Sequence, residues 1–215
     1  MGSHGPSRRD VLRAAGLVAA GAWITTGCGS QEVTSNGPPS LSAVGASADI
    51  ENEVLTLQTA ASLENLGVYA YTEALKRLHR GQFGSPPPVV VAFAERVREH
   101  HAEHAKALNR VLTAMGKRPY TQPDPQMLLT VKDGLPALRS IHDLSEFSVV
   151  FEDAVAQTHV RNLGELTDAR AVAVTAQIAP VEQQHVALLY VVEGKYPAPN
   201  DFTPTSQARP STDVT

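Results

Sequence analysis

Four long segments of this chain carry apolar side chains at alternating intervals of three and four residues. That spacing is typical of helices that bury one face. In the first segment it begins at Leu57, passes through Ala61 and ends at Leu78. Two-residue alternation, which would indicate half-buried strands, does not recur. The spacing predicts four helices, at residues 49–78, 89–115, 141–166 and 169–193.

The breaks between these segments indicate how the helices connect. Gly81 and the prolines at 86–88 end the first helix and allow the chain to reverse. Thr167 and Asp168 are suited to cap the fourth helix, so the last two helices also form a hairpin. Residues 117–140 are rich in proline and are expected to form a long crossover with at most a short helix. Two hairpins joined by one crossover predict an all-α, antiparallel four-helix bundle.

The first 28 residues differ from the helical part. Arg8 and Arg9 precede an apolar run at 14–24, which is too short to span a bilayer and ends shortly before Cys28. Residues 1–28 resemble a twin-arginine translocation signal, and their end resembles a lipoprotein cleavage site at which Cys28 is acylated. An uncleaved amphipathic start is the alternative.

Composition divides the rest of the chain. Residues 29–48 and 197–215 are rich in Ser, Pro and Thr. We expect the first of these segments to be a flexible linker and the second to be a loop followed by disorder, which leaves one domain at 49–196. A single cysteine excludes an internal disulfide and a cysteine-based zinc site. The formal net charge of -4 gives no general attraction for a polyanion, so nucleic acid is not an expected partner.

Each predicted helix also places acidic or histidine side chains on its inward face. An unpaired carboxylate in an apolar core costs several kcal/mol, so these groups require partners or a cation. The six residues are Glu64, His101, His104, Glu152, Glu182 and His185.

These six residues are expected at one height in the bundle, because residues at one level of a hairpin are equally far from its turn. The midpoint between Glu64 and the two second-helix histidines lies near residue 83, at about the centre of the first break. The midpoint between Glu152 and the fourth-helix pair lies at about residue 168, between the last two helices. Each set lies about 21 to 24 Å from its turn at a rise of ~1.5 Å per residue, so the two sets can meet.

Such a cluster predicts a metal site. Residues three apart share a helix face, so His101 with His104, and Glu182 with His185, can each direct two donors to one point. Oxygen and imidazole donors suit Fe(II), Mn(II) or Zn(II). A buried, hydrogen-bonded polar network without metal is the alternative.

Several motifs resemble those of the exported ferritin-like domain proteins of bacteria, a branch of the ferritin, rubrerythrin and bacterioferritin group. They include Leu63-Glu64-Asn65-Leu66, Glu99-His100-His101-Ala102-Glu103-His104, Glu152 and Glu182-Gln183-Gln184-His185. The resemblance covers roughly residues 49–203 and implies a ferritin-like bundle. It also implies a dinuclear iron or manganese centre held by Glu64, His104, Glu152, Glu182 and His185.

His101 departs from the family pattern, which has Glu three residues before the second-helix histidine. Three carboxylates leave two divalent ions with excess positive charge, so a single ion, or zinc, is the alternative. His159 and Tyr71 each lie seven residues beyond a predicted ligand on the same stripe and are candidates for a second layer around the metal. His100 lies beside the stripe and is expected at the surface.

The function expected from these features is redox chemistry at a dinuclear centre outside the cytoplasmic membrane, either metal-ion oxidation or oxygen or peroxide reduction. A non-catalytic surface lipoprotein, or a bundle that binds one metal ion, is the alternative. The expected partners are metal ions and, through Cys28, the membrane. We expect a monomer or small oligomer rather than a storage cage, because a lipid anchor would hinder cage closure.

Overall fold

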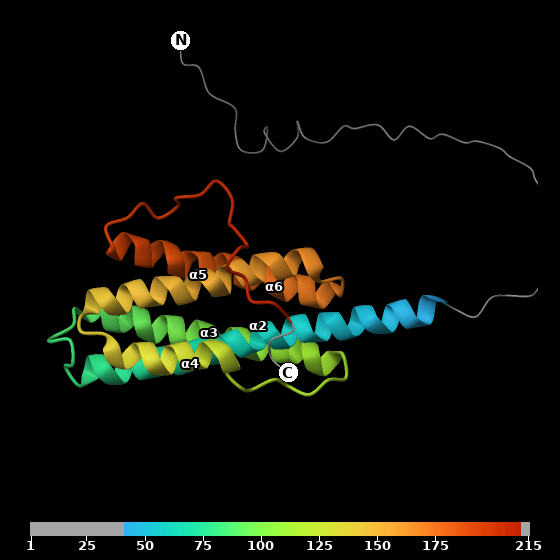
Figure 1. The fold of residues 1–215 in the computed structure, drawn as a ribbon, viewed down its shortest axis with the longest axis horizontal. Helices are drawn as coiled ribbons and strands as arrows, with labels where there is room; N and C mark the ends of the chain where they lie inside the picture. The colour runs from blue at the N-terminus through green and yellow to red at the C-terminus, as the bar shows by residue number, and fades with distance from the viewer. Residues whose placement is uncertain (1–40, 212–215) are drawn as a thin grey trace, which may run out of the picture. The chain divides into compact units, whose positions relative to one another are not determined.

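The computed structural model describes residues 41–211, and the leader residues Arg8, Arg9 and Cys28 lie outside this range. The described part is helical (Figure 1). Its elements are α2 (Leu41–His79), α3 (Pro88–Ala114), α4 (Pro125–Gly134), the short 3-10 helix η1 (Leu135–Ala137), α5 (Ile141–Glu165) and α6 (Ala169–Val192).

The four long helices form a bundle of two hairpins, as the spacing predicted. Helix α2 pairs with α3 and α5 pairs with α6, while α2 also contacts α5 and α3 contacts α6. The crossover contains α4 and η1, and α4 lies against α2 (Figure 1). Figure 1 shows the four long helices lying side by side along the length of the bundle. The predicted all-α bundle of two hairpins joined by a long crossover is therefore confirmed.

The ends of the helices follow local sequence signals. Asp168 caps α6, because its carboxylate accepts hydrogen bonds from the backbone N–H groups of Arg170 and Ala171. Gly116 and Gly194 follow α3 and α6 with φ of 74° and 69°, the left-handed conformation that glycine adopts without strain. Helix α2 begins at Leu41 rather than at residue 49, so it extends into the expected linker.

Two apolar clusters fill the bundle on either side of its polar middle. One includes Leu66, Leu75 and Val155, and the other includes Leu57 and Leu112. Burial of these side chains supplies the main stabilisation of a helical bundle. The polar residues between the clusters are thereby kept away from solvent.

The segment after α6 was expected to be a loop followed by disorder, but up to residue 211 it is a strap held against the bundle. The backbone N–H of Gln207 donates to Oε1 of Gln157 at 2.8 Å, and that of Arg209 donates to Oγ1 of Thr158 at 2.9 Å. Arg209 also forms an ion pair of 3.1 Å with the buried Asp124. These contacts explain why a segment without regular secondary structure is ordered.

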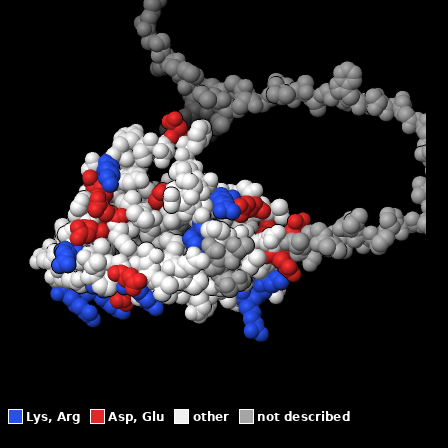
Figure 2. Space-filling view, viewed as in Figure 1, with Lys and Arg blue, Asp and Glu red and all other residues white. Residues whose placement is uncertain are grey.

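The surface carries charges of both signs. On the face shown in Figure 2, acidic and basic side chains are interspersed around a largely uncharged middle. Among the helices that the structure describes, none is long and apolar enough to cross a membrane.

Candidate metal centre

All six side chains predicted to face inward from the four long helices meet in the middle of the bundle. Glu64, Glu152 and Glu182 are completely buried. His101 is also completely buried, and 12% of the His104 side chain is exposed. His185 is buried as well, with 3% exposed. The six residues were predicted to share one height because they lie equally far from the turns of their hairpins, and the structure brings them together.

His101 lies between two carboxylates. Its Nδ1 is 2.7 Å from Oε2 of Glu64, and its Nε2 is 3.2 Å from Oε1 of Glu152. Ionised carboxylates only accept hydrogen bonds, so both ring nitrogens must carry a proton to donate them. Burial lowers the pKa of His101, because it disfavours the charged form of the ring. The charges of Glu182 and Glu152 and the two hydrogen bonds outweigh burial and raise this pKa well above its ordinary value.

His104 and Glu182 contain two buried atoms without a hydrogen bond among the described residues. Nδ1 of His104 lies 2.7 Å from Oε1 of Glu182, yet the two atoms are not aligned for a hydrogen bond. The same nitrogen is 3.4 Å from Oε2 of Glu64. Burial opposes protonation of His104, but the two neighbouring carboxylates raise its pKa to about 9. The two atoms thus lie at ion-pair distance without the geometry of a hydrogen bond.

His185 contacts both Glu152 and Glu182 and also His100, a histidine that was not predicted to belong to the site. Its Nδ1 is 3.2 Å from both Oε2 of Glu152 and Oε2 of Glu182. Burial lowers its pKa, but these contacts outweigh burial and raise it to about 9. Its Nε2 is 2.9 Å from Nδ1 of His100. His100 was expected at the surface but is half-buried, and burial together with the charges of His185 and His104 lowers its pKa.

Hydrogen bonds from histidines keep Glu64 and Glu152 ionised despite burial. Burial raises the pKa of a carboxyl group, but His101, His104 and His159 hold the pKa of Glu64 well below its ordinary value. The charge of His101 and hydrogen bonds from His101 and His185 likewise lower the pKa of Glu152. The buried carboxylates of the site are therefore balanced by the imidazoles that contact them.

The two predicted second-layer residues both lie next to the cluster. Nε2 of His159 donates to Oε1 of Glu64 at 2.7 Å, so this imidazole can orient a carboxylate of the site. The ring of Tyr71 lies 5.7 Å from that of His101. Burial and the charge of Glu152 raise the pKa of Tyr71 well above its ordinary value, which keeps its hydroxyl neutral.

Gly67 leaves space for the ring of His101, and it was not among the residues predicted for the site. A Cβ at this position would lie 2.5 Å from both Cγ and Cδ2 of the His101 ring. An isolated glycine inside a helix costs stability, so its presence there commonly has a packing reason. That signal in the first helix could have identified Gly67 as part of the site.

The donor atoms form two overlapping groups, and within each group one ligand atom per residue lies within 4.8 Å of the others. The groups are Glu64, His101, His104 and Glu182, and His101, Glu152, Glu182 and His185. The two groups share His101 and Glu182. Carboxylate oxygens and imidazole nitrogens fit divalent iron, manganese or zinc.

A third group, separate from the centre, lies at one end of α5 and α6. It comprises His142, Glu146 and Glu193, of which the first two are exposed. Acidic groups at a surface are common without a bound ion, so this group carries no assignment.

Comparison with known protein families agrees with this architecture. Residues 52–195 match the family described as "Ferritin-like domain". No curated protein matches the chain. The matched range begins within α2 and ends just beyond α6, so it includes all six clustered residues.

Proposed function

This chain belongs to the ferritin-like domain family, and on that premise we propose that it binds divalent metal ions at the centre and performs redox chemistry there. The reaction proposed is oxidation of metal ions or reduction of oxygen or peroxide. Iron and manganese are the proposed metals, because oxygen and imidazole donors suit both and both change oxidation state.

The observation that carries this proposal is the unsatisfied pair formed by Nδ1 of His104 and Oε1 of Glu182. These two buried atoms lie 2.7 Å apart, which is an ion-pair distance, but without the geometry of a hydrogen bond. Both belong to residue types that ligate metals. A cation bound by both atoms would give each the directed partner that the other does not provide.

The proposed ligands are the three carboxylates and three imidazoles of the cluster. They are Glu64, Glu152 and Glu182, with His101, His104 and His185. A bound iron or manganese pair would supply the electrons for reduction of oxygen or peroxide. The chain itself holds the ligands in place: His159 orients Glu64, and the two apolar clusters keep water away from the centre.

His101 affects how many ions the centre holds. With two divalent ions, three carboxylates leave one excess positive charge, whereas the family pattern with a fourth carboxylate would leave none. His101 also has both ring nitrogens engaged by carboxylates. Binding of one ion, or of zinc without redox chemistry, is therefore the second candidate.

Export and membrane anchoring are part of the same proposal. Arg8 and Arg9 support translocation through the twin-arginine route, and Cys28 supports a lipid anchor on the outer face of the cytoplasmic membrane. A protein anchored in this way is proposed to act as a monomer or small oligomer. A non-catalytic surface lipoprotein would share these features, so only chemistry at the centre separates the two proposals.

Metal analysis followed by oxidation tests the redox function. Protein purified from its own host is analysed for iron, manganese and zinc, then loaded with Fe(II) without oxygen and exposed to oxygen or peroxide. We expect one to two equivalents of metal and an absorption change on oxidation. Bound metal below about half an equivalent, or no absorption change after loading, contradicts redox function at this centre.

A pair of matched variants tests the ligand assignment. Glu182→Gln removes a carboxylate charge from the centre with little change in size and should reduce the metal content. Glu103→Gln makes the same change at an exposed position on α3 that is paired with Lys106, and should leave the metal content unchanged. Full metal content in Glu182→Gln would show that this residue is not a ligand.

A further inference from the structure

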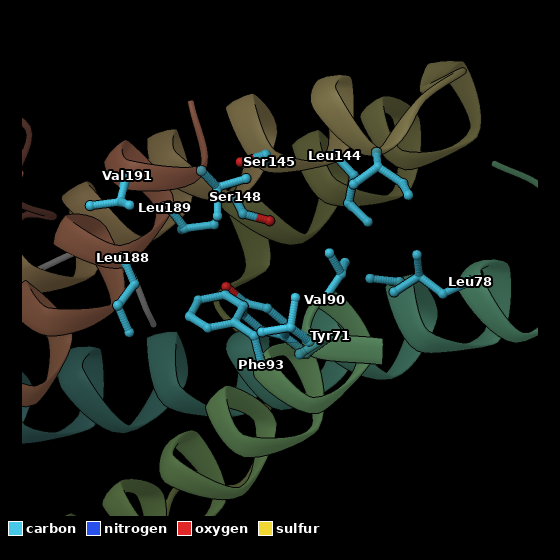
Figure 3. A pocket seen from close by; sticks show the side chains of 15 residues that line it. Tyr71, Leu78, Val90, Phe93, Leu144, Ser145, Ser148, Leu188, Leu189 and Val191 are labelled. Atoms are coloured by element: carbon cyan, nitrogen blue, oxygen red, sulfur yellow. The ribbon is translucent and has the colours of Figure 1, made fainter. Parts of the chain in front are cut away.

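An apolar cavity of about 270 Å³ adjoins the metal centre (Figure 3). All four long helices contribute to its wall. Figure 3 shows Leu78, Phe93, Leu144 and Leu189 among the side chains around it. For comparison, an apolar cavity of about 150 Å³ is large enough to bind benzene. The cavity therefore has room for an aliphatic chain of medium length.

Two hydroxyl groups of the cavity wall lack hydrogen-bond partners among the described residues. They belong to Tyr71 and Ser145, whose exposed fractions are only 5% and 6%. The Tyr71 hydroxyl lies near enough to Glu152 and Ser148 for both to affect its pKa, but it forms no hydrogen bond of normal geometry with the described residues. Figure 3 shows Ser148 and Tyr71 on walls formed by α5 and α2. Buried hydroxyls without partners are uncommon, and a bound molecule could satisfy them.

The outer rim of the cavity is formed by exposed aliphatic side chains. Val89, Leu188, Val191 and Val192 all line the cavity, and each is more than half exposed, from 53% for Leu188 to 73% for Val89. Exposed aliphatic side chains that gather at the mouth of one cavity are typical of binding sites. The rim thus offers an apolar entrance, and the two hydroxyls offer hydrogen bonds deeper inside.

The lining of the cavity restricts its occupant. None of the described residues that line it is charged. A ligand carboxylate would therefore be buried without a counter-ion, which is costly, whereas a hydroxyl or carbonyl group can bond to the hydroxyls of the wall. The ring of Tyr71 also lies 5.7 Å from that of His101, so the polar end of an occupant would be one side chain away from the centre.

We propose that this cavity binds a neutral molecule with one aliphatic chain and one terminal hydroxyl or carbonyl group. The polar group bonds to the hydroxyls of Tyr71 and Ser145, and the chain extends toward the exposed rim at Leu188. Binding requires no metal ion, so a failure of the redox proposal leaves this one open to its own test.

Titration of the metal-free full chain with three probes of equal chain length tests the chemistry of the occupant. Calorimetry compares 1-octanol, octanoate and octane. We expect one molecule of 1-octanol to bind per chain. Octanoate and octane should bind at least about tenfold more weakly, because octanoate would bury a charge without a counter-ion and octane lacks a hydrogen bond. Equal binding of all three, or no binding of 1-octanol, overturns the proposal.

Variants locate the binding site. Tyr71→Phe and Ser145→Ala each remove one hydroxyl and should lower the affinity for 1-octanol about five- to tenfold. Leu188→Asp places a charge at the rim and should lower the affinity for every probe. Val150→Asp is the matched control, because Val150 is 73% exposed and does not line this cavity. Circular dichroism identifies variants that fail to fold, and binding is compared only among the variants that fold. Unchanged 1-octanol affinity in folded Ser145→Ala and Leu188→Asp overturns the proposal.

Discussion

The imidazole ring of His101 packs directly against Gly67, so that a Cβ at residue 67 would lie 2.5 Å from two of its carbon atoms. Real Cβ atoms essentially never approach other heavy atoms so closely. Helix α2 therefore supplies both a carboxylate of the centre, Glu64, and the space into which the central histidine fits. The absence of a side chain at residue 67 is part of the site.

Gly67→Ala should displace His101. The added methyl group cannot be accommodated without movement of the ring or of the helices, and overpacking of this kind costs about 1–3 kcal/mol. We expect a lower free energy of unfolding in urea and reduced metal content, because the moved ring no longer lies between Glu64 and Glu152.

Gly164→Ala is the matched control for this substitution. Gly164 is an exposed residue in α5 with no atom within 4 Å of its added Cβ. Alanine should stabilise the helix there by about 0.4–1 kcal/mol. Equal effects of the two substitutions would show that contact with His101 is not what distinguishes residue 67.

His101→Glu should increase the dependence of stability on metal. Without metal, the variant places four carboxylates in one buried site and removes a cation, at a cost of about 3–5 kcal/mol. With two divalent ions, the charges balance, so the rise in Tm on addition of Mn(II) should exceed that of the unaltered chain. His101→Gln, which adds no charge, should show a smaller rise, and an equal rise in both variants would contradict the charge argument.

The helices and the positions of the six clustered residues could be predicted because both follow from regular geometry. Apolar spacing sets the buried face, and the constant helical rise fixes the height of a residue once the turn is located. Helices α5 and α6 begin at the predicted residues, and α3 begins within a residue of its prediction. The assignment of the six residues as metal ligands stays a prediction.

Features that depend on contacts between helices could not be predicted in the same way. His100 lies about 100° around α3 from His101, which placed it beside the inward stripe, but the approach of α6 brings it to His185. The strap after α6 was misjudged for a similar reason. Its composition indicates the absence of regular structure, but not the absence of bonds such as that between Arg209 and Asp124.

Arg209→Ala should loosen this strap. The guanidinium group contacts both carboxylate oxygens of the completely buried Asp124. Its loss would leave Asp124 with the hydrogen bonds from the backbone N–H groups of Gln126 and Met127. We expect a loss of about 1–3 kcal/mol in the free energy of unfolding. Arg161→Ala breaks a more exposed pair with Glu165 and should cost no more than about 0.5 kcal/mol. Equal costs would mean that the Arg209 side chain stabilises the fold no more than a surface ion pair does.

Asp168 should make a pH-dependent contribution to stability through the start of α6. The side-chain hydrogen bond from Arg170, together with backbone N–H donors, lowers the pKa of Asp168 to about 2. A carboxyl group whose folded pKa is lowered stabilises the fold fully above its unfolded pKa of 3.8, and this contribution is lost as the pH falls toward 2. Asp168→Ala removes the cap as well as the charge and should lower the free energy of unfolding by about 1 kcal/mol near neutral pH.

Asp168→Asn keeps an acceptor for the backbone N–H groups but loses the charge. Urea unfolding of the unaltered chain and of Asp168→Asn at several pH values isolates the charge, because all other carboxyl groups are common to both. The difference between them should be largest near neutral pH and shrink below the unfolded pKa, and a difference that does not vary with pH would contradict this account.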